Sequence, residues 1–123
     1  MDKNILRDEL KEAKEWAKIN LVGKKVYHEG IGKNVTFTQK GIKHALHTKS
    51  SPIKIYLIYH AIKVLKSSTL DCKEKDKKGR ADIKNVYRLV NTIEFDNKKY
   101  DVFIVIRETK EGFLYYDHGG IKK

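Results

Sequence analysis

Histidine, lysine and arginine are the residues of this 123-residue sequence whose types and spacing suit chemistry. The segment KGIKHALH, residues 40–47, places His44 and His47 three positions apart among lysines. His118 follows Tyr-Tyr-Asp and precedes two glycines, which allow the chain to approach other groups closely. Histidine exchanges protons near neutral pH, and lysine or arginine stabilises negative charge. The pattern therefore predicts acid–base chemistry on an anionic substrate.

Cleavage of RNA without a metal is the reaction that these residue types suit. A general base takes the proton of the 2′-OH, which attacks the adjacent phosphorus, and a general acid protonates the leaving 5′-oxygen. RNA rather than DNA is the expected substrate, because the 2′-OH is the nucleophile. Phosphate-binding loops, dinucleotide fingerprints, zinc-ligand spacings and nucleophile elbows do not occur in the sequence. We therefore expect neither a metal nor a cofactor.

Four residues are the predicted catalytic set. His44 and His118 would serve as base and acid, in an order that the sequence leaves open. Lys43 and Arg107 would hold the phosphate. Arg107 ends an apolar strand segment and alternates with apolar residues, and a charge on such a half-buried face needs a partner or an anionic ligand.

Five further residues are predicted to bind RNA around that set. Lys40 and His47 lie on either side of His44 in the KGIKHALH segment. Tyr115 and Tyr116 must point to opposite faces of a strand, so one belongs to the core and the other is free to stack on a base. Thr92 is a weaker candidate on an earlier strand.

Each histidine also has a purely structural interpretation. His44 and His47 would be ordinary solvated residues of a helix surface if the face has no function. His60 lies among apolar neighbours, which predicts a buried structural histidine. His28 stands beside a turn and is expected to have no functional role.

The positive charge is concentrated in the middle of the chain. The formal net charge is +11, yet residues 1–21 hold five bases and five acids. Residues 22–66 hold nine lysines and one glutamate, a net +8, and residues 67–123 hold thirteen bases and ten acids. A concentrated positive field attracts polyanions, nucleic acid first among them. The alternative is a lysine-rich composition that serves solubility.

The first half of the chain predicts helices around a short hairpin. Apolar residues at positions 6, 10, 13 and 17 predict an amphipathic helix over residues 1–21, with Trp16 docking it. Residues 24–38 contain two glycines between β-branched residues and predict a hairpin. Thr38 is the expected N-cap of a helix over 39–48. At 100° per residue this helix has one basic face, with members Lys40, Lys43, His44 and His47.

The second half predicts a buried helix, a loop and a meander. Ser51 and Pro52 begin a nearly all-apolar segment, expected to be the central helix up to residue 66. Residues 67–85 lack an apolar period and predict a mobile loop. Residues 86–118 contain three strand patterns separated by turns. The prediction is one α+β domain, with N-terminal helices on one face of a four-stranded antiparallel sheet made of the meander and a short N-terminal strand.

Three stretches of the sequence resemble a known superfamily. They are AKEWAKINLVGKKV (13–26), VTFTQKGIKHAL (35–46) and YDVFIVIRETKEGFLYYDH (100–118). Together they are similar to the phage-associated and polymorphic-toxin ribonucleases of the barnase–EndoU–colicin–RelE superfamily. The resemblance implies that RNA is cleaved on the open face of the sheet, and it singles out Lys43, His44, Tyr115, Tyr116 and His118.

The leading hypothesis is a metal-independent ribonuclease toxin domain that works by 2′-OH transesterification. It implies RNA and an acidic cognate immunity protein as partners, a monomer apart from that inhibitor, and no membrane. Residues 1–16 lack the apolar stretch of a signal peptide, so we expect action in a bacterial cytoplasm after delivery within a larger phage or secreted protein. The alternatives are a non-catalytic RNA- or DNA-binding module, and an interaction protein without a nucleic-acid role.

Overall fold

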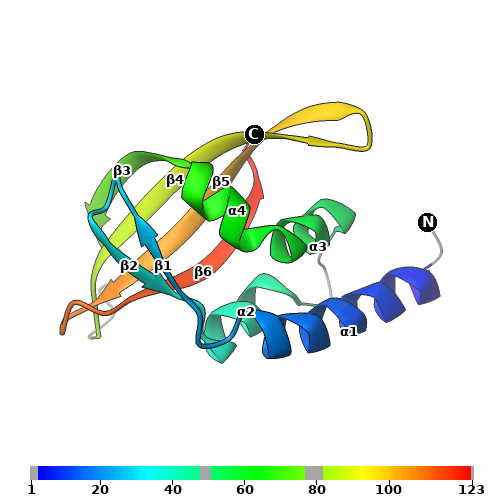
Figure 1. Ribbon diagram of the computed structural model, residues 1–123, viewed down its shortest axis with the longest axis horizontal. Helices are drawn as coiled ribbons and strands as arrows, with labels where there is room; N and C mark the ends of the chain where they lie inside the picture. Colours follow the sequence, from blue (N-terminus) through cyan, green and yellow to red (C-terminus); the bar gives the residue numbers. More distant parts are fainter. Residues whose placement is uncertain (1–2, 48–50, 77–81, 123) are drawn as a thin grey trace.

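The computed structural model describes residues 3–47, 51–76 and 82–122, and its elements are ordered as in Figure 1. The helices are α1 (Lys3–Asn20), α2 (Gln39–Ala45), α3 (Pro52–Tyr59) and α4 (Ala61–Ser67). The strands are β1 (Lys25–His28), β2 (Lys33–Thr36), β3 (Thr69–Lys75), β4 (Ile83–Phe95), β5 (Lys98–Thr109) and β6 (Leu114–Ile121). No helix among the described residues is long and apolar enough to cross a membrane.

The strands form one six-stranded mixed sheet in the order β1-β2-β6-β5-β4-β3. Strands β2 and β6 run parallel, pairing Val35 with Leu114 and Thr36 with Tyr115, and the other neighbouring pairs are antiparallel. The predicted four-stranded antiparallel sheet is therefore wrong. The predicted hairpin and three-strand meander are present, but they join through a parallel contact that no local pattern encodes.

Strand β3 is the second departure from the predicted fold. It occupies residues 69–75 of the segment that the sequence predicts to be a loop, while residues 77–81 lie outside the described residues. Its sequence TLDCKEK is polar and mostly exposed, so it has no buried face to produce an apolar alternation. The strand exists because its backbone pairs with the long strand β4 at the edge of the sheet.

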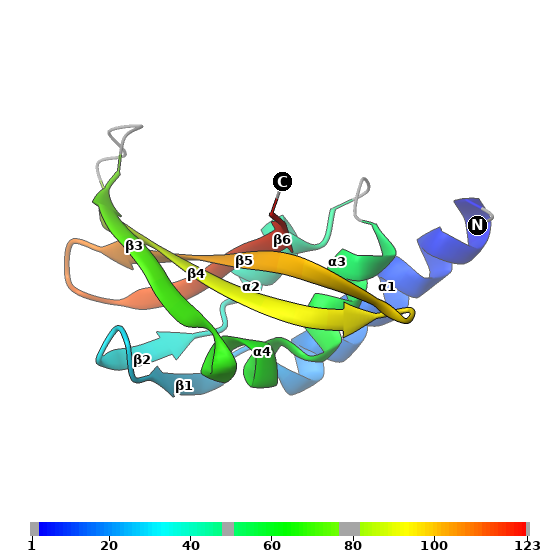
Figure 2. The same ribbon diagram turned by 90° about the horizontal axis from the view of Figure 1, so that it is seen from above.

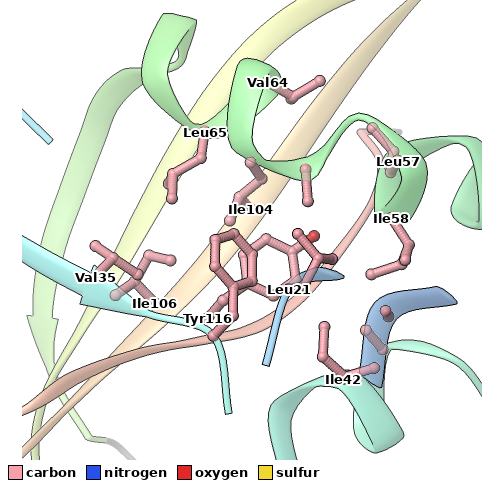
Figure 3. Packing of buried hydrophobic residues seen from close by; sticks show 14 of the residues in the cluster. Leu21, Val35, Ile42, Leu57, Ile58, Val64, Leu65, Ile104, Ile106 and Tyr116 are labelled. Atoms are coloured by element: carbon pink, nitrogen blue, oxygen red, sulfur yellow. The ribbon is translucent and has the colours of Figure 1, made fainter. Parts of the chain in front are cut away.

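The core lies between the helices and one face of the sheet (Figure 3). The sheet curls so that α4 contacts both β1 and β4, which are separated by three strands in the sheet order. On β5 the alternate residues Val102, Ile104 and Ile106 are buried on the helix side. We call the opposite side, which the helices leave uncovered, the outer face (Figure 2).

Helix α1 follows the predicted amphipathic stripe. Leu10, Ala13 and Ala17 are buried, and the Trp16 ring lies 4.9 Å from the ring of Tyr59 on α3, as centroids. The side chain of Leu6 lies outside the described residues. The small alanines allow close packing of α1 on α3, and the aromatic pair fixes the helix to the body of the protein.

The predicted single central helix is two helices, α3 and α4, that meet at His60. His60 has non-helical backbone angles and is exposed, with its ring 4.2 Å from that of Tyr56, so the prediction of a buried histidine is wrong. His28 is instead the buried histidine, 3% exposed. Its Nε2 donates to the carbonyl of Ser68 at 2.7 Å and its Nδ1 accepts from the amide of Ile31, so it links β1 to the end of α4.

Candidate active site

Helix α2 brings its side chains to β6 through a very close backbone contact. Thr38 caps the helix as predicted, accepting a hydrogen bond from the amide of Gly41 at 3.0 Å. A Cβ at position 41 would collide with the carbonyl oxygen of Tyr116, so only glycine fits here. This contact places His44, one turn further along α2, over the middle of β6.

A β-bulge on β6 supplies the other half of the site. His118 pairs with Val105 and Tyr116 pairs with Ile106, so Asp117 is an extra residue without a partner on β5. In a regular strand Asp117 and His118 would point to opposite faces. The bulge turns both toward the outer face, as bulges near functional sites often do.

Asp117 accepts a hydrogen bond from each of two histidines. Its Oδ1 lies 2.9 Å from Nδ1 of His44, and its Oδ2 lies 2.7 Å from Nδ1 of His118. The two imidazole rings meet edge to face with centroids 5.1 Å apart. Because the carboxylate engages both Nδ1 atoms, Nε2 is the atom of each ring that faces away from Asp117. The His44 side chain is 55% exposed and that of His118 is 30% exposed, so solvent reaches both rings.

Arg107 completes the charge balance from β5. Its Nε lies 3.1 Å from Oδ2 of Asp117, although this buried Nε makes no hydrogen bond within the described part of the chain. Burial raises the pKa of Asp117, but the hydrogen bonds from His118 and His44 and the charge of Arg107 outweigh it. The pKa of Asp117 therefore lies well below its usual value, and the carboxylate stays ionised.

The same three side chains also have the composition of a metal site. Ligand atoms of His44, Asp117 and His118 lie within 4.8 Å of one another. Two imidazoles and a carboxylate suit several transition metals. Arg107 opposes this use, because its positive charge already neutralises the carboxylate that a cation would need. The arrangement suits proton transfer better than metal binding.

A pocket of about 290 Å³ opens beside His44 and Asp117. Lys40, on the same side of α2 as His44, and Tyr115, on the outer face of β6, line it. Asp82 and Ile83 also line it. The pocket thus combines one imidazole, two carboxylates and one lysine, and Lys40 is the cation that an anionic group entering it would meet.

Lys43 and His47 do not lie with this group. Lys43 lines a separate hollow together with Lys14 and Lys18 of α1. It is adjacent to His44 in sequence and so points about 100° away around the helix. The basic arc predicted for this helix therefore divides, with its Lys40–His44 part toward β6 and its Lys43 part toward α1. His47 is exposed and lies beyond the end of α2 at Ala45.

Two other predicted RNA-binding residues also lie away from the histidine pair. Tyr116 is 1% exposed and stacks on Phe37 in the core. Burial and then the charge of Asp117 raise its pKa well above the usual tyrosine value. Thr92 donates to Asp101 at 2.9 Å and pairs with it across β4 and β5. Its partner Asp101 is six residues along β5 from Arg107, about 20 Å in an extended strand.

Sequence reasoning missed three residues of the site. Asp117 is visible in the sequence as a carboxylate directly before His118, but only the bulge reveals that both share a face. Phe103 on the outer face of β5 packs its ring against that of His118, with centroids 5.9 Å apart at 90°. Arg88 of β4 covers the same phenyl ring at 4.6 Å. These contacts pack the His118 ring against side chains of β5 and β4.

The fold and the site together define a small α+β domain with a paired-histidine site on the uncovered face of its sheet. Residues 5–116 match the family described as large polyvalent protein-associated domain 3, and the chain belongs to that family. Neither the comparison with curated proteins nor that with solved structures gives a match. The family places the chain among domains associated with large polyvalent proteins and assigns it no ribonuclease activity.

Proposed function

We propose that this domain is a metal-independent ribonuclease that cleaves RNA by 2′-OH transesterification. The observation that carries the proposal is the pair His44 and His118 on one buried, ionised carboxylate, Asp117. Acid–base cleavage of RNA needs two proton-transfer groups close together, and here their rings are 5.1 Å apart. Burial of the Asp117 carboxylate carries a desolvation cost that a carboxylate on a solvated surface does not have.

The role of Asp117 is to position both imidazoles. Its oxygens accept from Nδ1–H of each ring, so the lone pair of a neutral ring is held on Nε2. The same hydrogen bonds stabilise the imidazolium form, whose Nε2–H faces outward. One carboxylate thus prepares one histidine as base and the other as acid, in either order.

The reaction follows from these positions. One Nε2 removes the proton of the 2′-OH, and the 2′-oxygen forms a bond to the adjacent phosphorus. The bond from phosphorus to the 5′-oxygen breaks, and the other Nε2–H donates its proton to that oxygen. The products are a 2′,3′-cyclic phosphate and a free 5′-hydroxyl. No co-reactant is required.

Charge stabilisation of the developing oxyanion is assigned to Arg107, and Lys40 is assigned to binding of an RNA phosphate. The Arg107 side chain is 11% exposed beside Asp117, and Lys40 lines the pocket of His44. Buried positive charge acts more strongly on a developing oxyanion than charge in water. Lys43 lines a different hollow, and so its proposed role passes to Lys40.

The biological setting is proposed on the family and on the charge of the chain. Membership in a family of polyvalent protein-associated domains fits a domain carried by a larger phage or secreted polypeptide. A ribonuclease of this kind would act as a toxin in a bacterial cytoplasm, held inactive by an acidic immunity protein. The net +8 of residues 22–66 supplies the field that such an inhibitor or RNA would meet.

The test is incubation of the purified protein with RNA in EDTA, followed by analysis of fragment ends. We expect fragments with 2′,3′-cyclic phosphate ends, and no cleavage of the matching 2′-deoxy strand. His44→Ala and His118→Ala should each lower the rate by roughly 10²–10⁴-fold. His60→Ala is the matched control, because His60 is an exposed histidine at the α3–α4 junction, and it should cleave at the parental rate. Relief of growth arrest by His118→Ala on bacterial expression would give the same answer in cells.

Binding without cleavage would contradict the proposal. Salt-dependent affinity for RNA of unchanged length would identify the alternative, a basic nucleic-acid-binding module. Cleavage at the parental rate by both histidine variants would remove His44 and His118 from the mechanism.

A further inference from the structure

A second groove is lined by residues of the β1–β2 hairpin and of the segment that leads into β6. The β1–β2 and β5–β6 turns lie at the same end of the sheet (Figures 1 and 2). The volume of the groove is about 420 Å³. Its lining includes Lys25 and Tyr27 of β1, Thr36 of β2, and Phe113 before β6. We call it the aromatic groove.

Two aromatic side chains of this groove are exposed without a core function. Tyr27 is 56% exposed and Phe113 is 43% exposed, while their strand neighbours Val26 and Leu114 are buried. Alternation along the chain accounts for the outward direction but not for the choice of aromatic residues at both outward positions, one on β1 and one just before β6. Exposed aromatic rings beside cations are the surface on which unpaired bases stack.

The aromatic groove is continuous with the candidate active site. The Phe113 ring stacks on that of Tyr115, with centroids 6.4 Å apart and planes at 26°. Tyr115 in turn lines the pocket that contains His44 and Asp117. From Phe113 to Asp117 is four residues of extended chain, about 13 Å. A strand of RNA whose phosphate lies at His44 and His118 can therefore follow the outer face of β6 into the groove.

The charge of the groove fits the phosphates of such a strand. Lys25 is exposed on its wall. Lys33 also lines it, but its Nζ is engaged by Oε2 of Glu108 at 2.8 Å, which leaves Lys25 as the main cation. The hairpin belongs to the segment of net +8.

We propose that the aromatic groove binds the unpaired nucleotides of single-stranded RNA that extend beyond the cleaved phosphate, stacking bases on Tyr27 and Phe113 with Lys25 on the backbone. This inference rests on the proposed ribonuclease function. It makes single-stranded rather than duplex RNA the substrate, because bases in a duplex cannot present their faces to side chains.

The binding test uses a fluorescently labelled 2′-O-methyl RNA oligonucleotide, which transesterification cannot cleave, as a single strand and as a duplex. We expect the parent to bind the single strand more tightly. Tyr27→Ala and Phe113→Ala should each weaken single-strand binding by about 5- to 150-fold. Tyr27→Phe and Phe113→Tyr should keep the affinity, because the ring is retained. Ile19→Ala is the control, since Ile19 is 80% exposed on α1, and it should bind as the parent does.

The cleavage test separates this groove from the catalytic residues. With a long oligonucleotide, Phe113→Ala should raise KM and leave kcat near the parental value. With a dinucleotide, too short to reach the groove, it should change neither. Parental single-strand affinity in both alanine variants would overturn the inference, as would equal losses for single strand and duplex. If no protein cleaves RNA but the alanine variants still lose single-strand affinity, this inference stands and the proposed catalysis fails.

Discussion

Arg107 and Glu108 are neighbours on β5, yet they belong to polar clusters on opposite faces of the sheet. Arg107 approaches Asp117 on the outer face. Glu108 is 2% exposed on the core side, where its carboxylate accepts from Asn85 at 2.7 Å, Lys33 at 2.8 Å and Tyr87 at 3.3 Å. The two clusters each hold one buried carboxylate and differ in what surrounds it.

The partners of each carboxylate decide what it can do. Those of Glu108 are an amide, an ammonium and a phenol, and none of these groups exchanges protons readily at neutral pH. Burial raises the pKa of Glu108, but the hydrogen bonds from Asn85 and Lys33 outweigh it and leave the pKa below its ordinary value. Asp117 has two partly exposed imidazoles as partners. The Glu108 cluster therefore fastens β2, β4 and β5 together, and the Asp117 cluster offers proton transfer.

The largest expected effect comes from Asp117→Asn. The asparagine would lose the negative charge and can present only one oxygen to the two imidazoles. We expect the rate of RNA cleavage to fall by at least about 10²-fold, with RNA affinity retained. Single-turnover cleavage and binding of an uncleavable strand would be measured side by side. A parental rate would remove Asp117 from the mechanism.

Glu108→Gln is the matched change in the other cluster. It should lower the free energy of unfolding by about 1–3 kcal/mol, because a buried acceptor loses its charged partner Lys33. Urea denaturation would measure this loss. At temperatures where the variant is folded it should cleave RNA at the parental rate. A loss of activity comparable to that of Asp117→Asn would show that the two clusters are not functionally distinct.

Acid stability should depend on both carboxylates. Each has a folded pKa below its unfolded value, so each stabilises the protein above the unfolded value, and this stabilisation is lost as the pH falls through about 4 and below. The melting temperature of the parent should therefore fall more steeply below pH 5 than that of Asp117→Asn or Glu108→Gln. Glu94→Gln, at an exposed position of β4, should keep the parental slope.

Lys40→Ala should change binding rather than catalysis. Lys40 lines the pocket of His44 and is assigned to phosphate. Its removal should weaken RNA binding and reduce the slope of log affinity against log salt by about one unit. Lys43→Ala is the control, because Lys43 lies on the α1 side of the same helix. Equal effects of the two variants would indicate a diffuse basic surface.

Chelation should have the smallest effect. The positive charge of Arg107 beside Asp117 opposes a bound cation, so the cleavage rate in EDTA should equal the rate without it. Complete loss of activity in EDTA, with recovery on addition of Mg²⁺ or Zn²⁺, would contradict the metal-independent mechanism. It would favour a metal ion bound by His44, Asp117 and His118.

The sequence by itself determined the elements that have a local pattern. Apolar periodicity predicted α1, alternation predicted β4 and β6, a nearly continuous apolar run predicted β5, and Thr38 marked the start of α2. The sequence also identified His44, His118 and Arg107 as candidates, because histidine is suited to proton transfer and arginine to stabilising negative charge. The sequence neighbours of a histidine did not predict its burial: His60, expected to be buried, is exposed, and His28 is buried.

Only the tertiary structure decided which candidates meet. The parallel contact of β2 with β6 joins residues nearly eighty positions apart and leaves no trace in local periodicity. The bulge at Asp117 reverses the face of every residue after it, so simple alternation misplaces His118. The contact of Gly41 with Tyr116 sets which side of α2 lies over β6, and this separates His44 from Lys43. Short-range patterns encode local conformation, whereas the site depends on long-range packing that no window of the sequence contains.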